Sequence, residues 1–233
     1  MKLSHIFILS GAGLSAESGL KTFRDNGGLW ENHRVEDVAT PEAFADNPDL
    51  VHRFYNERRA QLGSVAPGAA HQALARLQKE FQGTVTLVTQ NVDDLLTRAG
   101  AEDVIHMHGR LQQIRCESCG STFNWAGDCT VETPCPSCGQ VGGLRPDIVW
   151  FGEMPKYMTE IYQALGSCDL FVSIGTSGHV YPAAGFVQMV AETGLAARVE
   201  INLEQSAGSH MFTENRFGPA GTLVPAFVEE ILS

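Results

Sequence analysis

The stretch HIFILSGAGLS, residues 5–15, joins a short apolar run to a turn of small and polar residues. Three further segments have the same form: VTLVTQNVD (85–93), DLFVSIGTSG (169–178) and ARVEINLEQ (197–205). Continuous apolar runs of this length, separated by helical patterns, indicate parallel strands that are buried on both faces. We therefore predict an α/β fold with a doubly wound parallel sheet. Its polar turns should gather at the carboxyl ends of the strands, where such sheets bind ligands.

Helical periodicity occurs between these runs. PGAAHQALARLQKEF (67–81) begins with proline and places Leu74, Leu77 and Phe81 on one face, and PAFVEEIL lies near the end of the chain. Residues 111–147 break the alternation, because they are rich in Cys, Gly, Ser and Thr with almost no apolar periodicity. We expect this segment to be an insert that is held together by something other than an apolar core.

The bulk composition limits the classes of partner. The chain has 233 residues, of which 43% are hydrophobic, so it can bury a substantial core. A formal net charge of −11 argues against a general nucleic-acid binder and suits basic partners such as lysine side chains. The run after Met1 is too short for a membrane span and lacks the features of a secretory signal. We expect no membrane partner and a cytoplasmic location.

Four of the six cysteines form two C-x-x-C pairs, Cys116 with Cys119 and Cys135 with Cys138, separated by fifteen residues. Two such turns offer four thiolates to a tetrahedral ion, which is the all-cysteine geometry of structural zinc. Four sulfur ligands leave no open position for water. We therefore predict one zinc ion per chain that holds the insert together and takes no part in chemistry.

Two cysteines and two histidines remain after this assignment. Cys129 lies between the pairs and could substitute as a ligand, whereas Cys168 precedes an apolar run and should be an inert core residue. His106 and His108, in HMHG, are free for another role because sulfur already fills the metal site. Imidazole suits proton transfer near neutral pH, so these histidines are candidates for catalysis.

The turn GAGLSAESG (11–19) is similar to a dinucleotide-binding glycine turn, although Ala16 replaces its third glycine. Gly11 and Gly13 would still permit backbone amides to approach a pyrophosphate, and Ser15 and Ser18 could cap a following helix. An ordinary tight turn between a strand and a helix is the alternative.

Seven motifs occur in a characteristic order: GAGLSAESGLKTFR, TQNVDDL, HMHG, the two C-x-x-C pairs, VWFGE, GTSGHVYPAA and INLE. Together they resemble the sirtuins, the NAD-dependent protein lysine deacylases, from about Leu9 to Pro225. VEDVATPEAF and FYNERR are similar to the bacterial members and to the subgroup that removes acidic acyl groups. Two residues depart from the family pattern, because Lys21 stands where proline is usual and Asp147 where many members have histidine.

The resemblance implies one catalytic unit with two domains. A Rossmann-like NAD-binding domain would comprise approximately residues 1–27, 67–110 and 148–233. A smaller domain would combine a helical insert with the acyl pocket, approximately 28–66, and the zinc ribbon, approximately 111–147. A monomer is expected, as for the family's short members.

The resemblance also implies that NAD is consumed as a co-substrate. An acylated lysine of a protein substrate would be converted to lysine, with release of nicotinamide and O-acyl-ADP-ribose. His108 matches the general base of the family, while His106 would be structural. Two alternatives stay open, namely protein mono-ADP-ribosyl transfer and a non-catalytic module that binds NAD or ADP-ribose.

The remaining site residues follow from the same match. Those implied to bind the cofactor are Gly11, Ala12, Gly13, Ser15, Phe23, Arg24, Gln90, Asn91, Asp93, Gly175, Thr176, Ser177, Asn202 and Glu204. Those implied to bind the acyl-lysine substrate are Ala39, Tyr55, Arg58, Val149 and Phe151. VWFGE would pair with an extended substrate peptide as an added strand.

Tyr55 and Arg58 are spaced i, i+3, so on a helix they share a face and can converge on one ligand. A phenol and a guanidinium together suit a carboxylate, such as the end of a succinyl, malonyl or glutaryl group. Without the family match, Arg58 would be read as a solvated charge and Tyr55 as a packing residue. Arg59 should point elsewhere on the helix.

Overall fold

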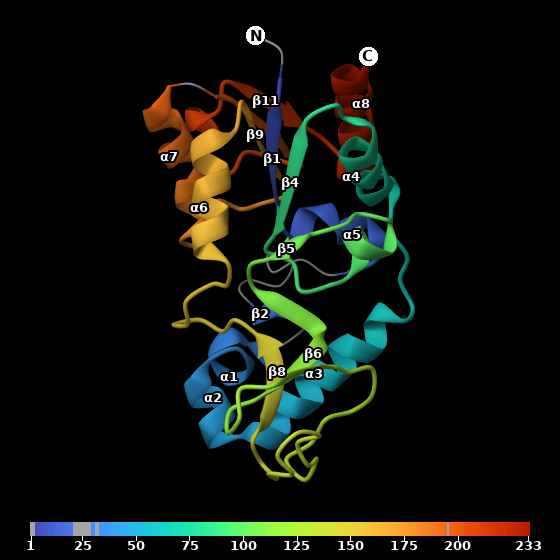
Figure 1. Ribbon diagram of the computed structural model, residues 1–233, viewed down its shortest axis with the longest axis vertical. Helices are drawn as coiled ribbons and strands as arrows, with labels where there is room; N and C mark the ends of the chain where they lie inside the picture. The colour runs from blue at the N-terminus through green and yellow to red at the C-terminus, as the bar shows by residue number, and fades with distance from the viewer. Residues whose placement is uncertain (1–2, 21–28, 31–32, 195) are drawn as a thin grey trace.

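The computed structural model of the chain describes residues 3–20, 29–30, 33–194 and 196–233. Its main sheet has six parallel strands in the order β11-β10-β9-β1-β4-β5 (Figure 1). This is the doubly wound order, in which the chain leaves the central strand β1 first on one side and then on the other. The strands are β1 (His5–Ser10), β4 (Thr84–Thr89), β5 (Ile105–His106), β9 (Leu170–Ile174), β10 (Ala197–Asn202) and β11 (Glu214–Phe217).

Helices cover both faces of this sheet (Figure 1). Ile6 and Ile8 of β1 pack with α4 (Ala69–Glu80) and α8 (Ala220–Leu232). Phe7 and Leu9 pack on the opposite face with α6 (Met158–Ser167) and α7 (Phe186–Thr193). The alternation of successive β1 side chains between two apolar layers confirms the predicted doubly wound sheet.

A smaller lobe lies beyond the carboxyl ends of the main strands (Figure 1). Its helices are α1 (Val35–Val38), α2 (Pro41–Asp46) and α3 (Pro48–Leu62). Thr40 Oγ1 accepts a hydrogen bond from Ala43 N, and Asn47 Oδ1 accepts one from Leu50 N. Each cap precedes a proline at the first helical position, so local sequence fixes where α2 and α3 begin. The short strands β2 (Leu29–Trp30) and β3 (His33–Arg34) pair with each other, and α5 (Leu95–Arg98) follows β4.

The cysteine-rich segment has more regular structure than the sequence suggests. It contributes to a three-stranded antiparallel sheet of β6 (Gly109–Cys116), β7 (Thr122–Asn124) and β8 (Leu144–Ile148). Ile114 and Leu144 form a small apolar cluster there with three of the cysteines. The insert therefore has a small core of its own beside the four-cysteine cluster. A register shift between Gly109 and Ile114 interrupts the alternation of β6, which hides the strand from a periodicity search.

Within the described ranges, no helix has the length and apolar character needed to cross a membrane.

Candidate active site

A cavity of about 750 Å³ extends from the carboxyl ends of the main strands to the small lobe. Its walls include every described residue that the sequence analysis assigned to cofactor, acyl substrate or proton transfer. These are Gly11, Ala12, Gly13, Ser15, Ala39, Tyr55, Arg58, Gln90, Asn91, Asp93, His108, Val149, Phe151, Gly175, Thr176, Ser177, Asn202 and Glu204. Phe23, Arg24 and Lys21 lie outside the described residues. The fold thus brings the candidate residues together, while their individual roles stay predictions.

Two glycine turns interlock at the switch point between β1 and β9. A Cβ atom on Gly13 would lie 2.7 Å from Gly175 Cα, and one on Gly11 would lie 2.8 Å from Gly175 O. Gly175 itself has a φ of 63°, and Gly13 N donates to its carbonyl oxygen over 2.9 Å. In the sequence, Gly11 and Gly13 are expected because they let backbone amides approach a pyrophosphate. In the structure, the glycines are also needed because a side chain at these positions would prevent the two turns from contacting each other.

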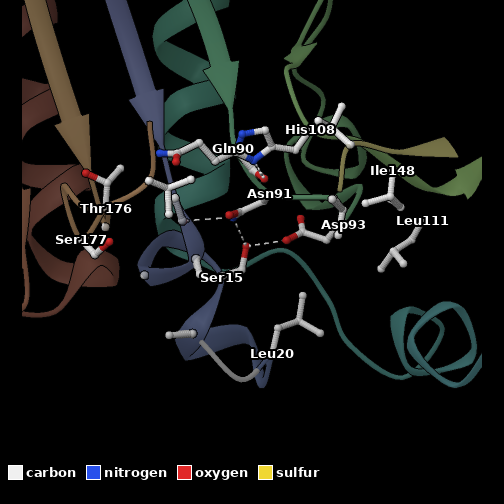
Figure 2. Close-up of a pocket in the computed structure, with 18 of the residues that line it drawn as sticks. Ser15, Leu20, Gln90, Asn91, Asp93, His108, Leu111, Ile148, Thr176 and Ser177 are labelled. Atoms are coloured by element: carbon white, nitrogen blue, oxygen red, sulfur yellow. Dashed lines mark hydrogen bonds between the residues drawn. The ribbon is translucent and has the colours of Figure 1, made fainter. Parts of the chain in front are cut away.

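Ser15 does not cap a helix. The chain after β1 forms two three-residue 3-10 helices, Ala12–Leu14 and Ala16–Ser18, and neither has a side-chain cap. The capping expectation is therefore wrong for Ser15, whereas Ser18 ends the second 3-10 helix and residues 21–28, which follow, lie outside the described residues. The buried Ser15 hydroxyl instead lies 2.9 Å from Asp93 Oδ2 and 3.1 Å from Asn91 Nδ2 (Figure 2).

Asn91 and Asp93 follow β4 and point toward Ser15 (Figure 2). Asn91 Nδ2 also donates to Gly11 O over 3.1 Å, and because a carbonyl only accepts, this bond fixes the orientation of the amide. Asp93 Oδ1 accepts a hydrogen bond from Leu95 N over 3.0 Å. Burial raises the pKa of the Asp93 carboxyl. The two side chains are held by the protein itself.

His108 has the geometry of a general base. Its Nδ1 lies 3.0 Å from Gln90 O, so Nδ1 carries the proton and Nε2 keeps its lone pair (Figure 2). Burial lowers the pKa of His108 from its ordinary value, which keeps the ring neutral at pH 7. His108 lines the cavity, and a proton can therefore be accepted at Nε2.

His106 differs from His108 although the two are close in sequence. It is buried, and it is not among the residues that line the cavity. Burial, followed by the charge of Arg110, lowers the pKa of His106 to about 4. Its Nδ1 lies 3.4 Å from Asn91 O. This position agrees with the structural role that the family resemblance implies.

The turns after β9 and β10 are joined by a side-chain bond. Asn202 Nδ2 donates to Thr176 O over 2.7 Å, and the hydroxyls of Thr176 and Ser173 lie 3.0 Å apart. Ser177 Oγ accepts a hydrogen bond from His179 N. The predicted pyrophosphate and adenosine ends of the site therefore form one continuous wall.

The small lobe forms the other end of the cavity. Tyr55 is buried on α3, and its hydroxyl accepts a hydrogen bond from Trp150 Nε1 over 2.9 Å. Burial raises the pKa of Tyr55, so the phenol stays protonated. The backbone N–H of Phe151 donates to Ala39 O, which ties the VWFGE segment to the helices.

Arg58 brings a charge to this end of the cavity with few protein partners. Its Nη2 lies 3.3 Å from Glu57 Oε2, and its guanidinium carbon lies 4.8 Å from the centre of the Phe54 ring. Among the described residues, nothing bonds to its buried Nε and Nη1. Arg59 points away, as predicted, and donates to the carbonyl oxygens of Leu111 and Gly127. Two N–H groups of Arg58 can therefore receive an anion.

The four predicted zinc ligands form one cluster. The Sγ atoms of Cys116, Cys119, Cys135 and Cys138 lie within 4.8 Å of one another. Cys116 with Cys138, and Cys119 with Cys135, are separated by 3.8 Å. A tetrahedron with Zn–S bonds of about 2.3 Å has edges of roughly this length, so the thiolates fit structural zinc. Cys129 is buried outside this cluster, and Cys168 is a core residue as expected.

Asp147, one of the two departures from the family pattern, has a local explanation. Its carboxylate is buried on β8 and forms a salt bridge with Lys156 Nζ. Lys156 N also donates to Met107 O, directly before His108. The acidic side chain is therefore compensated by a lysine that follows in the same part of the chain.

The sequence analysis missed three residues that support the site. The guanidinium carbon of Arg145 lies 3.3 Å from the centre of the Trp150 ring. Glu153 accepts hydrogen bonds from Arg145 and from Trp150 N, which holds VWFGE in place. His71, on α4, contacts Ser15. No motif marks these roles, since each depends on a contact that forms only when the chain folds.

A doubly wound sheet, a cavity at its switch point and a four-cysteine lobe define an α/β nucleotide-binding protein with a zinc-stabilised small lobe. Comparison with known proteins agrees with this class. The chain belongs to the Sir2 family, whose model matches residues 11–182.

Several relatives match almost the whole chain. An NAD-dependent protein deacylase of Bdellovibrio bacteriovorus is 57% identical over 98% of this chain and 97% of its own length. One of Escherichia coli strain K12 is 53% identical over 100% of this chain and 84% of its own length. A solved complex of a Sir2 homologue with NAD has a TM-score of 0.90 and 36% identity, covering 100% of this chain and 92% of that one.

Proposed function

We propose that this chain is an NAD-dependent protein lysine deacylase that removes acidic acyl groups as well as acetyl groups. The observation that carries the proposal is that His108, the glycine turns and Arg58 all line one continuous cavity. Relatives that are more than half identical along the chain are named NAD-dependent protein deacylases.

The general base would be His108. NAD, when bound, would supply an ADP-ribosyl group that accepts the acyl group, with nicotinamide leaving and one water molecule consumed. His108 would accept the proton of a ribose hydroxyl at Nε2, because its Nδ1–H donates to Gln90 O and leaves the Nε2 lone pair free. Asn91 and Asp93 would orient the nicotinamide amide and a water molecule beside it. The products would be unmodified lysine, nicotinamide and O-acyl-ADP-ribose.

An extended substrate peptide would add to VWFGE as a strand, with Val149 and Phe151 lining the passage for the acyl-lysine. Their backbone N–H groups already donate to His108 O and Ala39 O. The segment is thus fixed to both halves of the site, which supports a rigid edge for a peptide. Main-chain pairing reads little sequence, so we expect broad tolerance of substrate sequence.

Selectivity for acidic acyl groups would come from Arg58 and Tyr55. An acyl carboxylate could accept hydrogen bonds from the unpartnered Nε and Nη1 of Arg58. Glu57 contacts only Nη2 of Arg58 and is largely exposed, so a ligand that supplies an anion to the buried Nε and Nη1 atoms is favoured. Because Tyr55 stays protonated, it can share the same pocket without repelling the carboxylate.

We also propose a cytoplasmic location and a monomeric protein. None of the cysteines is paired in a disulfide, and a four-thiolate zinc site is typical of a reducing compartment.

Product analysis tests the activity. The protein is incubated with NAD and a succinyl-lysine or acetyl-lysine peptide, and the products are weighed by mass spectrometry. Deacylation yields unmodified peptide and O-acyl-ADP-ribose in equal amounts. ADP-ribosylated protein would instead indicate mono-ADP-ribosyl transfer, and unchanged NAD would indicate a binding module. Either of these two outcomes would contradict the proposal.

A further inference from the structure

His71 lies behind the wall of the cavity and does not line it. It belongs to the first turn of α4 and is 1% exposed. Its Nδ1 lies 3.2 Å from Gly68 N, and a backbone N–H can only donate, so Nδ1 accepts. Burial lowers the pKa of His71 to about 4, so the ring is neutral and its proton sits on Nε2.

Among the described residues this proton has one partner, the hydroxyl of Ser15, whose Oγ lies 3.2 Å from Nε2. Ser15 Oγ offers two lone pairs and one hydrogen. Nε2–H of His71 and Nδ2–H of Asn91 occupy the lone pairs. The hydroxyl hydrogen must then point to Asp93 Oδ2, which is 2.9 Å away and can accept it.

The hydrogen bonds of Asn91 fix the orientation of its amide. Its two N–H groups donate to Gly11 O and to Ser15 Oγ. Within the described part of the chain, no hydrogen bond is made to its Oδ1. That oxygen is therefore the one acceptor of the amide that remains for a ligand in the cavity.

We propose that His71 is a positioning residue for NAD, which acts through Ser15 to fix the directions in which Asn91 and Asp93 present their polar atoms. The proposal rests on the proposed NAD-dependent activity. It assigns a specific task to a helix residue that does not line the cavity. The expected consequence is that His71 changes the affinity for NAD and leaves the binding of the acylated peptide unaltered.

Two substitutions separate this role from simple capping of α4. His71→Asn keeps an acceptor near Gly68 N but cannot reach Ser15. His71→Gln can reach Ser15 with an N–H group but loses the acceptor for Gly68. Positioning predicts that His71→Asn weakens NAD binding and His71→Gln largely preserves it, whereas capping predicts the reverse order. Gln72→Asn, an exposed change on the same helix, is the matched control.

Isothermal titration calorimetry with NAD measures the affinity, steady-state kinetics measures KM for NAD and for peptide, and thermal unfolding follows the fold. We expect His71→Asn to raise Kd and KM for NAD about 10-fold, with KM for the peptide within about 2-fold of wild type. We expect about 2-fold or less for His71→Gln and Gln72→Asn. In a Ser15→Ala background, His71→Asn should add less than about 2-fold.

Multiplicative effects of Ser15→Ala and His71→Asn would overturn the proposal, as would wild-type affinity in a folded His71→Asn variant. If His71→Asn does not fold, a folded His71→Gln variant with a 10-fold loss of NAD affinity would overturn it equally. Wild-type protein that binds NAD but does not deacylate would contradict the proposed function and leave the positioning role standing. NAD affinity thus tests the role of His71, and deacylation by the wild-type protein tests the proposed function.

Discussion

The two ends of the cavity differ in whether the protein itself satisfies the hydrogen-bonding groups of their polar side chains. At the nucleotide end, the hydroxyl of Ser15 is saturated by His71, Asn91 and Asp93 before any ligand arrives. At the acyl end, two buried nitrogen atoms of Arg58, Nε and Nη1, have no hydrogen-bond partner among the described residues. Buried polar groups are normally paired, so the second arrangement costs free energy.

This difference indicates how each end selects its ligand. A saturated network is rigid and presents a fixed set of atoms to a ligand that every turnover shares. An unsaturated guanidinium gains most from a ligand that carries an anion, and less from one that does not. The acyl end is therefore where we expect discrimination between substrates.

The largest expected effect is that of His108→Ala. Removal of the imidazole removes the general base that accepts the proton at Nε2, so kcat should fall by at least about 10³-fold. Circular dichroism and zinc content should match wild type. His106→Ala, a buried residue outside the cavity, should lower kcat much less. Turnover within about 10-fold of wild type in purified His108→Ala would remove the assignment.

Loss of one zinc ligand should unfold the small lobe. Cys119→Ser leaves an incomplete tetrahedron over a core cluster of only a few residues. Elemental analysis should show one zinc per chain for wild type and none for the variant, with loss of activity. Ser137→Ala, an exposed position within the second knuckle, should retain both zinc and activity. Active enzyme without zinc would contradict this role.

Acid should lower the stability of the folded protein through His71 and His106, the two buried histidines near the nucleotide end. The folded-state pKa of both His71 and His106 is about 4, below the ordinary value of 6.5, so the unfolded chain binds more protons between these pH values. Stability is therefore present above pH 6.5 and is lost as the pH falls toward 4, by roughly 3 kcal/mol for each histidine. Chemical denaturation at several pH values measures this slope, and a flat profile from pH 7 to 4 would speak against it.

The smallest expected effect is a gain in kcat/KM for a succinyl-lysine peptide when Glu57 loses its charge. Glu57 contacts Arg58 Nη2 and is largely exposed, so its charge competes weakly with an acyl carboxylate. Glu57→Gln should raise kcat/KM for a succinyl-lysine peptide by about 2- to 3-fold and leave acetyl-lysine unchanged. Glu42→Gln, an exposed acid on α2, should change neither. A lower value for succinyl-lysine in Glu57→Gln would show that Glu57 assists binding.

The main sheet and the zinc site were predictable from sequence, because apolar runs and C-x-x-C spacing are local signals. The task of Ser15 was not, since its partners His71 and Asp93 lie 56 and 78 positions away. Strand β6 was not predicted, because a register shift interrupts the alternation of its buried and exposed side chains. The helical spacing of Tyr55 and Arg58 was sufficient to predict that Arg58 and Arg59 point in different directions. The bounds of the two domains stay a prediction.

The most direct test of the account compares kcat/KM for succinyl-lysine and acetyl-lysine peptides of the same sequence in wild type, Arg58→Met and Arg53→Met. Arg53 is an exposed arginine on the same helix and is the matched control. We predict that Arg58→Met loses about 2 to 4 kcal/mol on the succinyl peptide, a fall of roughly 30- to 900-fold. The acetyl peptide should change by less than about 3-fold, and Arg53→Met should resemble wild type on both. Equal losses on the two peptides in Arg58→Met, or a wild-type enzyme that ignores succinyl-lysine, would contradict the account.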